Sequence, residues 1–148
     1  MLPIKKILCP TDFSEPSYKG VDTANELAAH HSAELILVSV VTPIPTISPP
    51  GVPATYHLGD YYDEMVGYAN RSLQEIRQER ISPDLAVRSF VLQGIAADEI
   101  VKKAENEQVD VIVIATHGWN GWQRFVFGSV AEKVLRLAAC PVLTVPES

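Results

Sequence analysis

Apolar residues along the chain follow two alternating spacings. Short, continuous apolar runs rich in valine and isoleucine alternate with longer segments in which apolar residues recur every three or four positions. Continuous runs of this length are typical of strands buried on both faces, and the wider spacing is typical of amphipathic helices. The pattern predicts strands over residues 4–9, 35–41, 87–92, 110–116 and 141–145, and helices over residues 14–31, 60–81, 95–106 and 129–139.

The order of these elements predicts the architecture. Strands and helices alternate through five strands, which is typical of an α/β fold with a parallel sheet doubly wound by helices on both faces. Ligands of such sheets bind at the carboxyl ends of the strands. Thr11 and Asp12 follow the first strand, and a glycine-bearing loop from Gly118 to Ser129 follows the fourth. If these two strands are neighbours, an aspartate for ribose hydroxyls and a loop for phosphates meet in one crevice.

Two of the predicted helices have a defined apolar face. The face that we expect to be buried consists of Met65, Ala69, Leu73 and Ile76 in the helix over residues 60–81, and of Val130, Val134, Leu137 and Ala138 in the last helix. A stripe of this kind, repeated every three to four residues, packs against a sheet.

The stretch from Asp110 to Lys133 carries the strongest candidate chemistry. A buried strand leads through a glycine-bearing loop to Gly128 and Ser129, which stand directly before the last helix. We expect Ser129 to cap the helix N-terminus, next to a glycine that lets an anion approach the backbone. Free N–H groups and the positive end of the helix dipole would then point to one place, which favours phosphate binding.

The glycine spacing matches neither of the two commonest phosphate motifs. A Walker loop places lysine directly after its last glycine, whereas Gly128 is followed by Ser129 and Val130. The dinucleotide fingerprint needs three glycines right after a strand, and only Gly118 and Gly121 lie near one. The glycines alone are therefore as compatible with turns as with a ligand site.

Length and charge exclude several classes of protein. At 148 residues the chain is long enough for one domain. Its net charge of −6 argues against general binding to nucleic acid or to anionic membranes. No apolar run approaches about 18 residues, and no signal peptide is visible. Cys9 and Cys140 lie far apart in the sequence, so we expect two buried free thiols and a cytoplasmic protein.

Residues 42–59 interrupt the alternation of strands and helices. This segment contains five prolines and two glycines without any apolar periodicity. Irregular segments of this length are uncommon inside a compact domain, so we expect a functional or mobile loop within a single domain of 148 residues.

Five stretches of the sequence resemble the universal stress protein family. They are residues 5–14 (KKILCPTDFS), 35–40 (LILVSV), 109–114 (VDVIVI), 116–118 with 128–129 (THG and GS), and 140–145 (CPVLTV). They cover nearly the whole chain in the family's order. Nucleotide-binding members carry G-x2-G-x9-G-[S/T], which here becomes Ala115-x2-Gly118-x9-Gly128-Ser129. Ala115 replaces the first glycine, and we expect it to be tolerated because alanine readily adopts strand-end dihedrals.

The resemblance implies a fold, a ligand and a set of contacts. The implied fold is flavodoxin-like, of the adenine nucleotide alpha hydrolase type, with strand order three-two-one-four-five. The implied ligand is ATP, with or without Mg2+. By motif, Pro10, Thr11 and Asp12 contact the adenosine, with Asp12 on the ribose; Val40 and Ile114 flank the adenine; and Gly118, Gly128, Ser129 and Val130 hold the phosphates. In the same loop we expect His117 to form hydrogen bonds and Arg124 to supply a cation for the phosphates.

These residues lead to one main function and two alternatives. The main hypothesis is an ATP-binding stress-response or signalling module with slow or no hydrolysis, acting on an unknown protein partner. The alternatives are an ATPase or phosphotransferase on the same fold, and a nucleotide-free dimeric interaction protein. Family resemblance and the short apolar strand 142–145 also predict a homodimer paired through that strand.

Other polar clusters provide no catalytic or metal site. His57, Asp60, Asp63 and Glu64 match no standard metal-ligand spacing, and solvent-exposed acids at a helix start explain them. The sequence also lacks a nucleophile-elbow motif with which a Ser/His/Asp or Cys/His catalytic arrangement could be built.

Overall fold

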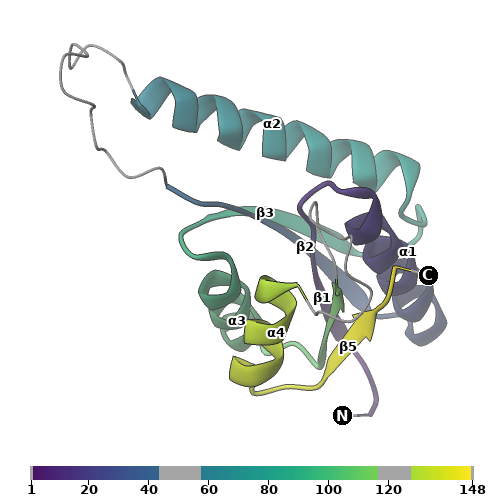
Figure 1. Ribbon diagram of the computed structural model, residues 1–148. Helices are drawn as coiled ribbons and strands as arrows, with labels where there is room; N and C mark the ends of the chain where they lie inside the picture. The colour runs from purple at the N-terminus through teal and green to yellow at the C-terminus, as the bar shows by residue number, and fades with distance from the viewer. Residues whose placement is uncertain (1, 44–57, 117–127, 148) are drawn as a thin grey trace, which may run out of the picture.

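The computed structural model describes residues 2–43, 58–116 and 128–147, in which strands and helices alternate along the chain (Figure 1). The strands are β1 (Lys6–Pro10), β2 (Glu34–Val41), β3 (Val87–Gln93), β4 (Val111–Ala115) and β5 (Val142–Val145). The helices are α1 (Glu15–His31), α2 (Leu58–Glu79), α3 (Ala96–Glu107) and α4 (Ser129–Leu137). Each predicted element is present, and its ends lie within two residues of the predicted ones.

The strands form a single parallel sheet in the order β3-β2-β1-β4-β5. This confirms the predicted doubly wound α/β fold and the strand order. β1 lies between β2 and β4, with Ile7 opposite Val111 and Leu8 opposite Ile112. The carboxyl ends of β1 and β4 therefore adjoin at the point where strand order reverses, which is where such folds bind ligands.

The core lies on both faces of the sheet because successive strand residues point in opposite directions. On one face, Ile7, Leu35 and Val113 pack with residues of α1 and α2. On the other, Leu8 and Ile112 pack with residues of α3 and α4. Figure 1 shows the two helix pairs on opposite sides of the sheet. Burial on both faces explains why the strands read as continuous apolar runs rather than as alternating ones.

The predicted apolar face of α2 is correct except at its first member. Ala69, Leu73 and Ile76 are buried, whereas Met65 is 39% exposed. Met65 lies within about 20° of Ile76 around the helix and so continues the same face, but it stands near the N-terminal end of α2, before the buried residues 69–76. Although α2 has 22 residues, neither it nor another helix in the described ranges combines the length and apolar character that crossing a bilayer requires.

The predicted face of α4 is wrong at two positions. Ala131 and Val134 are buried, but Val130 and Leu137 are 37% and 47% exposed. The helix has only nine residues, so one short contact of Ala131 and Val134, three residues apart, holds it to the sheet. Val130 and Leu137 lie at its two ends and stay outside this contact.

A network of ion pairs joins the start of β3 to the end of α3. Arg88 Nη2 lies 2.6 Å from Glu107 Oε2, and Lys103 Nζ lies 2.9 Å from Glu107 Oε1. Arg88 also forms an ion pair with Glu34. The hydrogen bonds from Arg88 and Lys103 lower the pKa of Glu107 from 4.5 to about 2. Because the folded-state pKa lies below the unfolded value, this network stabilises the fold above about pH 4.5 and loses its effect as the pH falls toward 2.

Replacing Glu107 with glutamine is expected to reduce the pH dependence of unfolding between about pH 5 and pH 2. At neutral pH the free energy of unfolding should fall by about 1 kcal/mol or less, since the pair is near the surface. Urea unfolding at several pH values measures both effects. Glu105→Gln is the matched control, because Glu105 is exposed on the same helix. Equal acid dependence in Glu107→Gln and the unmodified protein would contradict this role.

Candidate functional site

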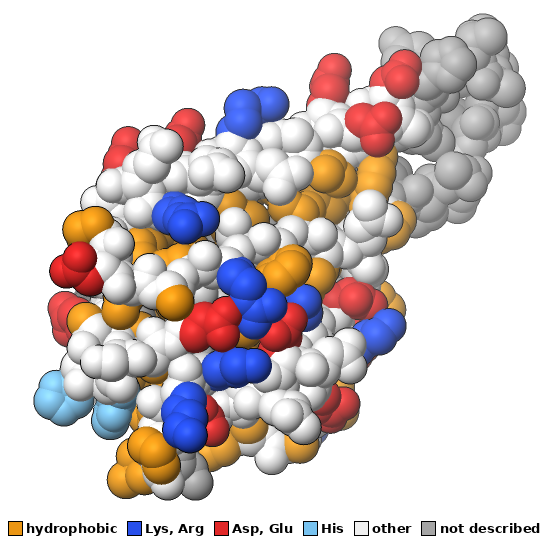
Figure 2. All heavy atoms as spheres, turned by 180° about the vertical axis from the view of Figure 1, so that it is seen from behind, with side chains coloured by type: hydrophobic (Ala, Val, Ile, Leu, Met, Phe, Trp, Pro, Cys, Tyr) orange, Lys and Arg blue, Asp and Glu red, His pale blue; other side chains and the backbone are white. Residues whose placement is uncertain are grey.

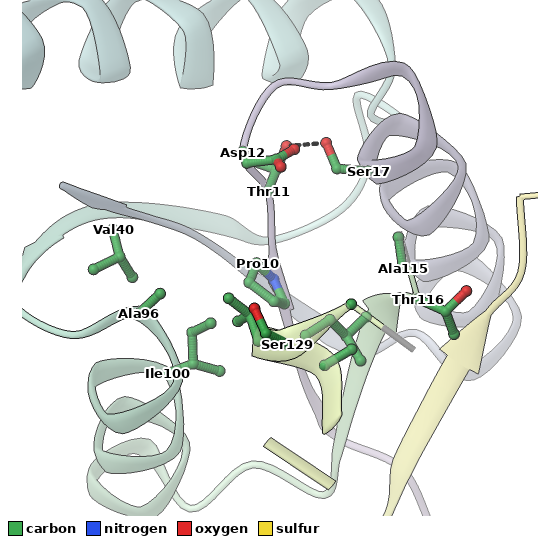
Figure 3. A pocket seen from close by; sticks show the side chains of 14 residues that line it. Pro10, Thr11, Asp12, Ser17, Val40, Ala96, Ile100, Ala115, Thr116 and Ser129 are labelled. Atoms are coloured by element: carbon green, nitrogen blue, oxygen red, sulfur yellow. Dashed lines mark hydrogen bonds between the residues drawn. The ribbon is translucent and has the colours of Figure 1, made fainter. Parts of the chain in front are cut away.

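A cavity of about 350 Å3 opens at the carboxyl ends of β1 and β4 (Figure 3). Its volume lies in the range of small-molecule sites, about 300–1,000 Å3. It lies on the α3 and α4 side of the sheet, between the ends of three strands and the first turns of α3 and α4, and Ser17 in the first turn of α1 lines its edge. The lining residues are Pro10, Thr11, Asp12, Ser17, Val40, Ala96, Ile100, Ile114, Ala115, Thr116, Gly128, Ser129, Val130 and Ala131.

Sequence-predicted site residues converge on this cavity. Those that line it are Pro10, Thr11, Asp12, Val40, Ile114, Ala115, Gly128, Ser129 and Val130. Residues from the two ends of the chain thus meet in one place, as the adjacency of β1 and β4 requires. His117, Gly118 and Arg124 lie outside the described residues. That the residues in the cavity contact a ligand stays a prediction.

Five lining residues were not predicted. They are Ser17, Ala96, Ile100, Thr116 and Ala131. Ala96 and Ile100 belong to the first turns of α3, which begins at the same edge of the sheet as the strand ends. Their position could have been inferred from the topology, because every helix that follows a parallel strand starts at the edge formed by the carboxyl ends of the strands. Thr116 is the last residue of the predicted strand 110–116, so its place at the carboxyl end of that strand could have identified it.

Hydrogen bonds fix the loop between β1 and α1. Thr11 is buried, its backbone N–H donates to the carbonyl of Val38 at 2.9 Å, and its Oγ1 lies 2.8 Å from Ser17 Oγ. Figure 3 shows this hydroxyl pair at the edge of the cavity. Thr11 Oγ1 also accepts from the backbone N–H of Phe13 at 3.0 Å. Phe13 has a φ of 65°, so the chain turns sharply just after Asp12.

Asp12 serves the local turn and faces the cavity as well. Its Oδ1 accepts from the backbone N–H of Ser14 at 3.0 Å and from the hydroxyl of Ser14. Ser14 in turn caps α1, because its Oγ accepts from the backbone N–H of Ser17 at 3.3 Å. The carboxylate is therefore held in a defined orientation at the end of β1, where a hydroxyl-bearing ligand could reach it.

The start of α4 forms the anion-attracting side of the cavity. Gly128, not Ser129 as predicted, is the N-cap, and it has no side chain that could occupy the helix end. The first helical hydrogen bond runs from the N–H of Glu132 to the carbonyl of Gly128 at 3.0 Å. The N–H groups of Ser129, Val130 and Ala131 precede that bond and have no acceptor within the helix. Together with the helix dipole they favour a bound anion.

The opposite side of the cavity is apolar. Val40, Ile100 and Ile114 contribute aliphatic side chains from β2, α3 and β4, and Pro10 contributes its ring. A flat aromatic ring could pack between these side chains, where few polar groups would lose hydrogen bonds to water. The cavity thus combines an apolar end, a carboxylate and an anion-attracting helix end. These features suit the base, the sugar and the phosphates of a nucleotide, respectively.

The methyl group of Ala115 points away from the cavity. By alternation along β4, Ile114 faces the α3 side of the sheet and Ala115 faces α1. A Cβ placed on Gly20 of α1 would lie 3.3 Å from Ala115 N and 3.6 Å from Ala115 Cβ. Figure 3 shows the methyl group directed toward α1. Gly20 therefore leaves room for Ala115, and the methyl group does not enter the ligand space.

For the nucleotide that the sequence resemblance implies, Ala115→Gly is consequently expected to leave the affinity within about twofold of the unmodified protein. The free energy of unfolding should fall by about 0.5–1 kcal/mol, because glycine weakens a strand. Titration calorimetry and urea unfolding measure the two quantities. The companion variant Gly20→Ala should destabilise the fold through its close approach to Ala115. A tenfold gain of affinity in Ala115→Gly would instead mean that the methyl group obstructs the ligand.

Carboxylates are scarce around the cavity. Among the described lining residues, Asp12 is the one acidic side chain. The described ranges also contain no group of three or more metal-ligating side chains. His57, one member of the cluster weighed from the sequence, lies outside these ranges.

Comparison with known proteins places the chain among proteins of this fold. The model of the universal stress protein family matches residues 3–146. Universal stress protein MJ0531 of Methanocaldococcus jannaschii is 33% identical over 141 residues, covering 95% of this chain and 81% of the relative. The solved structure of MJ0577 is 29% identical with a TM-score of 0.82, covering 97% of this chain and 96% of the other.

Two further solved structures share the fold and contain nucleotides. A universal stress protein in complex with cAMP is 21% identical with a TM-score of 0.65, and the match covers 98% of each chain. The universal stress protein of Archaeoglobus fulgidus in complex with dAMP is 21% identical with a TM-score of 0.60, covering 97% of this chain and 98% of the other. At this identity the two structures support the fold.

Proposed function

The chain belongs to the universal stress protein family, and from this membership and its own cavity we propose that it binds an adenine nucleotide, ATP. One observation carries the proposal: Asp12 and the N-terminus of α4 line the same cavity, together with the apolar side chains of Val40, Ile100 and Ile114. A carboxylate is suited to ribose hydroxyls, and a helix N-terminus is suited to phosphates.

The lining residues suggest how the nucleotide lies. The adenine packs between Val40, Ile100 and Ile114 at the apolar end. The ribose lies beside Asp12, and the phosphates approach the N–H groups of Ser129 and Val130. The cAMP and dAMP complexes of two proteins with this fold are consistent with an adenine nucleotide. ATP is proposed among adenine nucleotides because a helix N-terminus attracts a highly charged phosphate chain.

We propose binding with slow or no hydrolysis, as suits a stress-response or signalling module. Phosphoryl transfer needs Mg2+ ligands and a group that orients the attacking water near the γ-phosphate. Asp12 is the acidic side chain among the described lining residues, and in the proposed arrangement it lies beside the ribose instead. If Mg2+ accompanies ATP, the phosphates are its natural ligands.

Native mass spectrometry of the nucleotide-stripped protein tests this assignment. The protein is mixed with equal concentrations of ATP, ADP, AMP and cAMP, with and without Mg2+, and the bound masses are read directly. We expect one ATP per chain to dominate, with ADP formed at a rate well below the enzyme median of about 10 per second. Absence of any adduct, or adducts of all four nucleotides in equal amount, would contradict the proposal.

We also propose that the protein is a homodimer joined through β5. β5 pairs with β4 and has no other partner strand in the described part of the sheet. Its second residue, Leu143, is 41% exposed. An exposed apolar edge strand offers unpaired N–H and C=O groups, and twofold pairing with a second copy would cover them.

A cytoplasmic location is part of the same proposal. Cys9 and Cys140 are both free thiols. Cys9 is fully buried, and burial raises the pKa of its thiol to about 12, so it is a packing residue rather than a reactive one. Cys140 lies just before β5 and is partly buried. Free thiols suit a reducing compartment.

A further inference from the structure

Away from the cavity, the first three turns of α2 present an unusual exposed surface. Tyr61, Met65 and Tyr68 are 49%, 39% and 54% exposed. They are spaced by four and three residues, so they form one stripe along the helix. A single exposed apolar residue is ordinary, but aromatic residues and methionine are enriched at protein interfaces. A stripe made of two tyrosines and a methionine therefore indicates a contact surface.

Carboxylates stand next to this stripe. Asp60, Asp63 and Glu64 are exposed, and none of them forms an ion pair with another described residue. Residues 58–68 contain no lysine or arginine. Figure 2 shows acidic side chains gathered over this end of α2. A shallow hollow against the helix is lined by the stripe and the three carboxylates, together with Gly67 and a single cation, Arg71.

We propose that this α2 surface, formed by Asp60, Tyr61, Asp63, Glu64, Met65 and Tyr68, docks a cationic segment of a partner protein. Carboxylates attract lysine and arginine across an interface and fix the orientation of the partner. The faces of the tyrosine rings can also bind lysine and arginine, and the ring edges pack against apolar side chains. The flexible side chain of methionine adapts to the apolar residues of the segment.

The charge of the surface excludes other occupants. Nucleic acid and anionic membranes are repelled by the carboxylates and by the net charge of −6. A second copy related by a twofold axis would place the same patch opposite itself, so that Asp63 and Glu64 faced like charges. A cationic segment is the occupant that both the charge and the aromatic rings favour.

The α2 surface ends at the loop that carries Asp12. The ring of Phe13 packs edge-on against Tyr68, with 5.8 Å between ring centroids. A partner on this surface would therefore touch the loop next to the proposed nucleotide site. The docking proposal itself does not depend on nucleotide binding, because none of its six residues lines the cavity.

The probe for this surface is a fluorescein-labelled amphipathic helix of lysine and leucine, titrated into the full chain and read by fluorescence anisotropy. We expect saturable binding that is weakened about tenfold or more by the double variant Asp63→Lys/Glu64→Lys. Tyr61→Ser/Tyr68→Ser should weaken it about fivefold or more, since aromatic anchors carry much of such binding energy. These side chains are exposed, so the variants should keep the circular dichroism of the unmodified protein.

The matched control is Glu26→Lys/Glu105→Lys, which makes the same change of net charge at exposed positions on α1 and α3. It should alter the affinity by less than about twofold. Equal weakening by the control would mean diffuse charge attraction and would overturn the proposal. Equally tight binding of a peptide in which glutamate replaces lysine would also overturn the proposal. Self-association of the protein that is lost in the α2 variants would show a second copy as the occupant, which also overturns it.

Discussion

Replacing Ala96 with tryptophan is expected to lower ATP affinity by about 100-fold or more, equivalent to about 2.7 kcal/mol. Ala96 is the first residue of α3 and lines the cavity beside Val40 and Ile100. An indole at this position would occupy the space proposed for the adenine. The position is partly exposed at a helix start, so the fold should tolerate the larger side chain. Titration calorimetry measures the affinity, and thermal unfolding checks the fold.

Ile95→Trp is the matched control for this variant. Ile95 is the neighbouring residue, is 60% exposed and does not line the cavity. Its replacement adds the same indole next to the site without filling it, so the affinity should stay within about twofold. Unchanged affinity in Ala96→Trp would place the nucleotide elsewhere, and equal losses in both variants would indicate a general disturbance of α3.

Replacing Leu143 with lysine is expected to convert the proposed homodimer into monomers at micromolar concentration. Leu143 is 41% exposed on the edge strand β5 and lies opposite Val113 of β4. In a twofold antiparallel pairing the strand meets its own copy, so each substitution brings two charges into the interface. Burying such unpaired charges should raise the dissociation constant by about tenfold or more. Light scattering and sedimentation measure the mass.

Leu135→Lys provides a matched comparison, because Leu135 on α4 is also 41% exposed. If the dimer forms through β5, Leu135→Lys should stay dimeric. A monomeric unmodified protein would end the proposal. If Leu135→Lys dissociates while Leu143→Lys stays dimeric, the interface lies on α4 instead.

The fold could be predicted because the inner strands β1, β2 and β4 are buried on both faces and each helix is buried on one. This gives two clearly different apolar spacings, and their strict alternation leaves few topologies. The order of the strands came from resemblance to a family rather than from the pattern itself. Spacing alone was less accurate about which side chains are buried. Met65 and Val130 continue an apolar repeat, but a helix that contacts a sheet over a short length leaves such end positions exposed.

The candidate site was predicted where polar residues mark a strand end. Thr11, Asp12 and Gly128 stand out because they interrupt or follow an apolar run. Ala96 and Ile100 were missed, since an apolar residue in a helix reads as core and nothing local distinguishes a cavity wall from packing. The cap of α4 was assigned one residue too late because serine is the stronger N-cap by preference, whereas Gly128 holds the position. Tolerance of Ala115 was expected from its backbone dihedrals, but the sequence did not show that Gly20 of α1 lies next to its methyl group.

The proposed function depends on the binding of an adenine nucleotide in the crevice between β1 and β4. Isothermal titration calorimetry of ATP with Mg2+ into nucleotide-stripped protein tests it most directly. We expect a saturable heat with one ATP per chain, which disappears in Ala96→Trp and persists in Ile95→Trp. No heat and no thermal shift at millimolar ATP would contradict it.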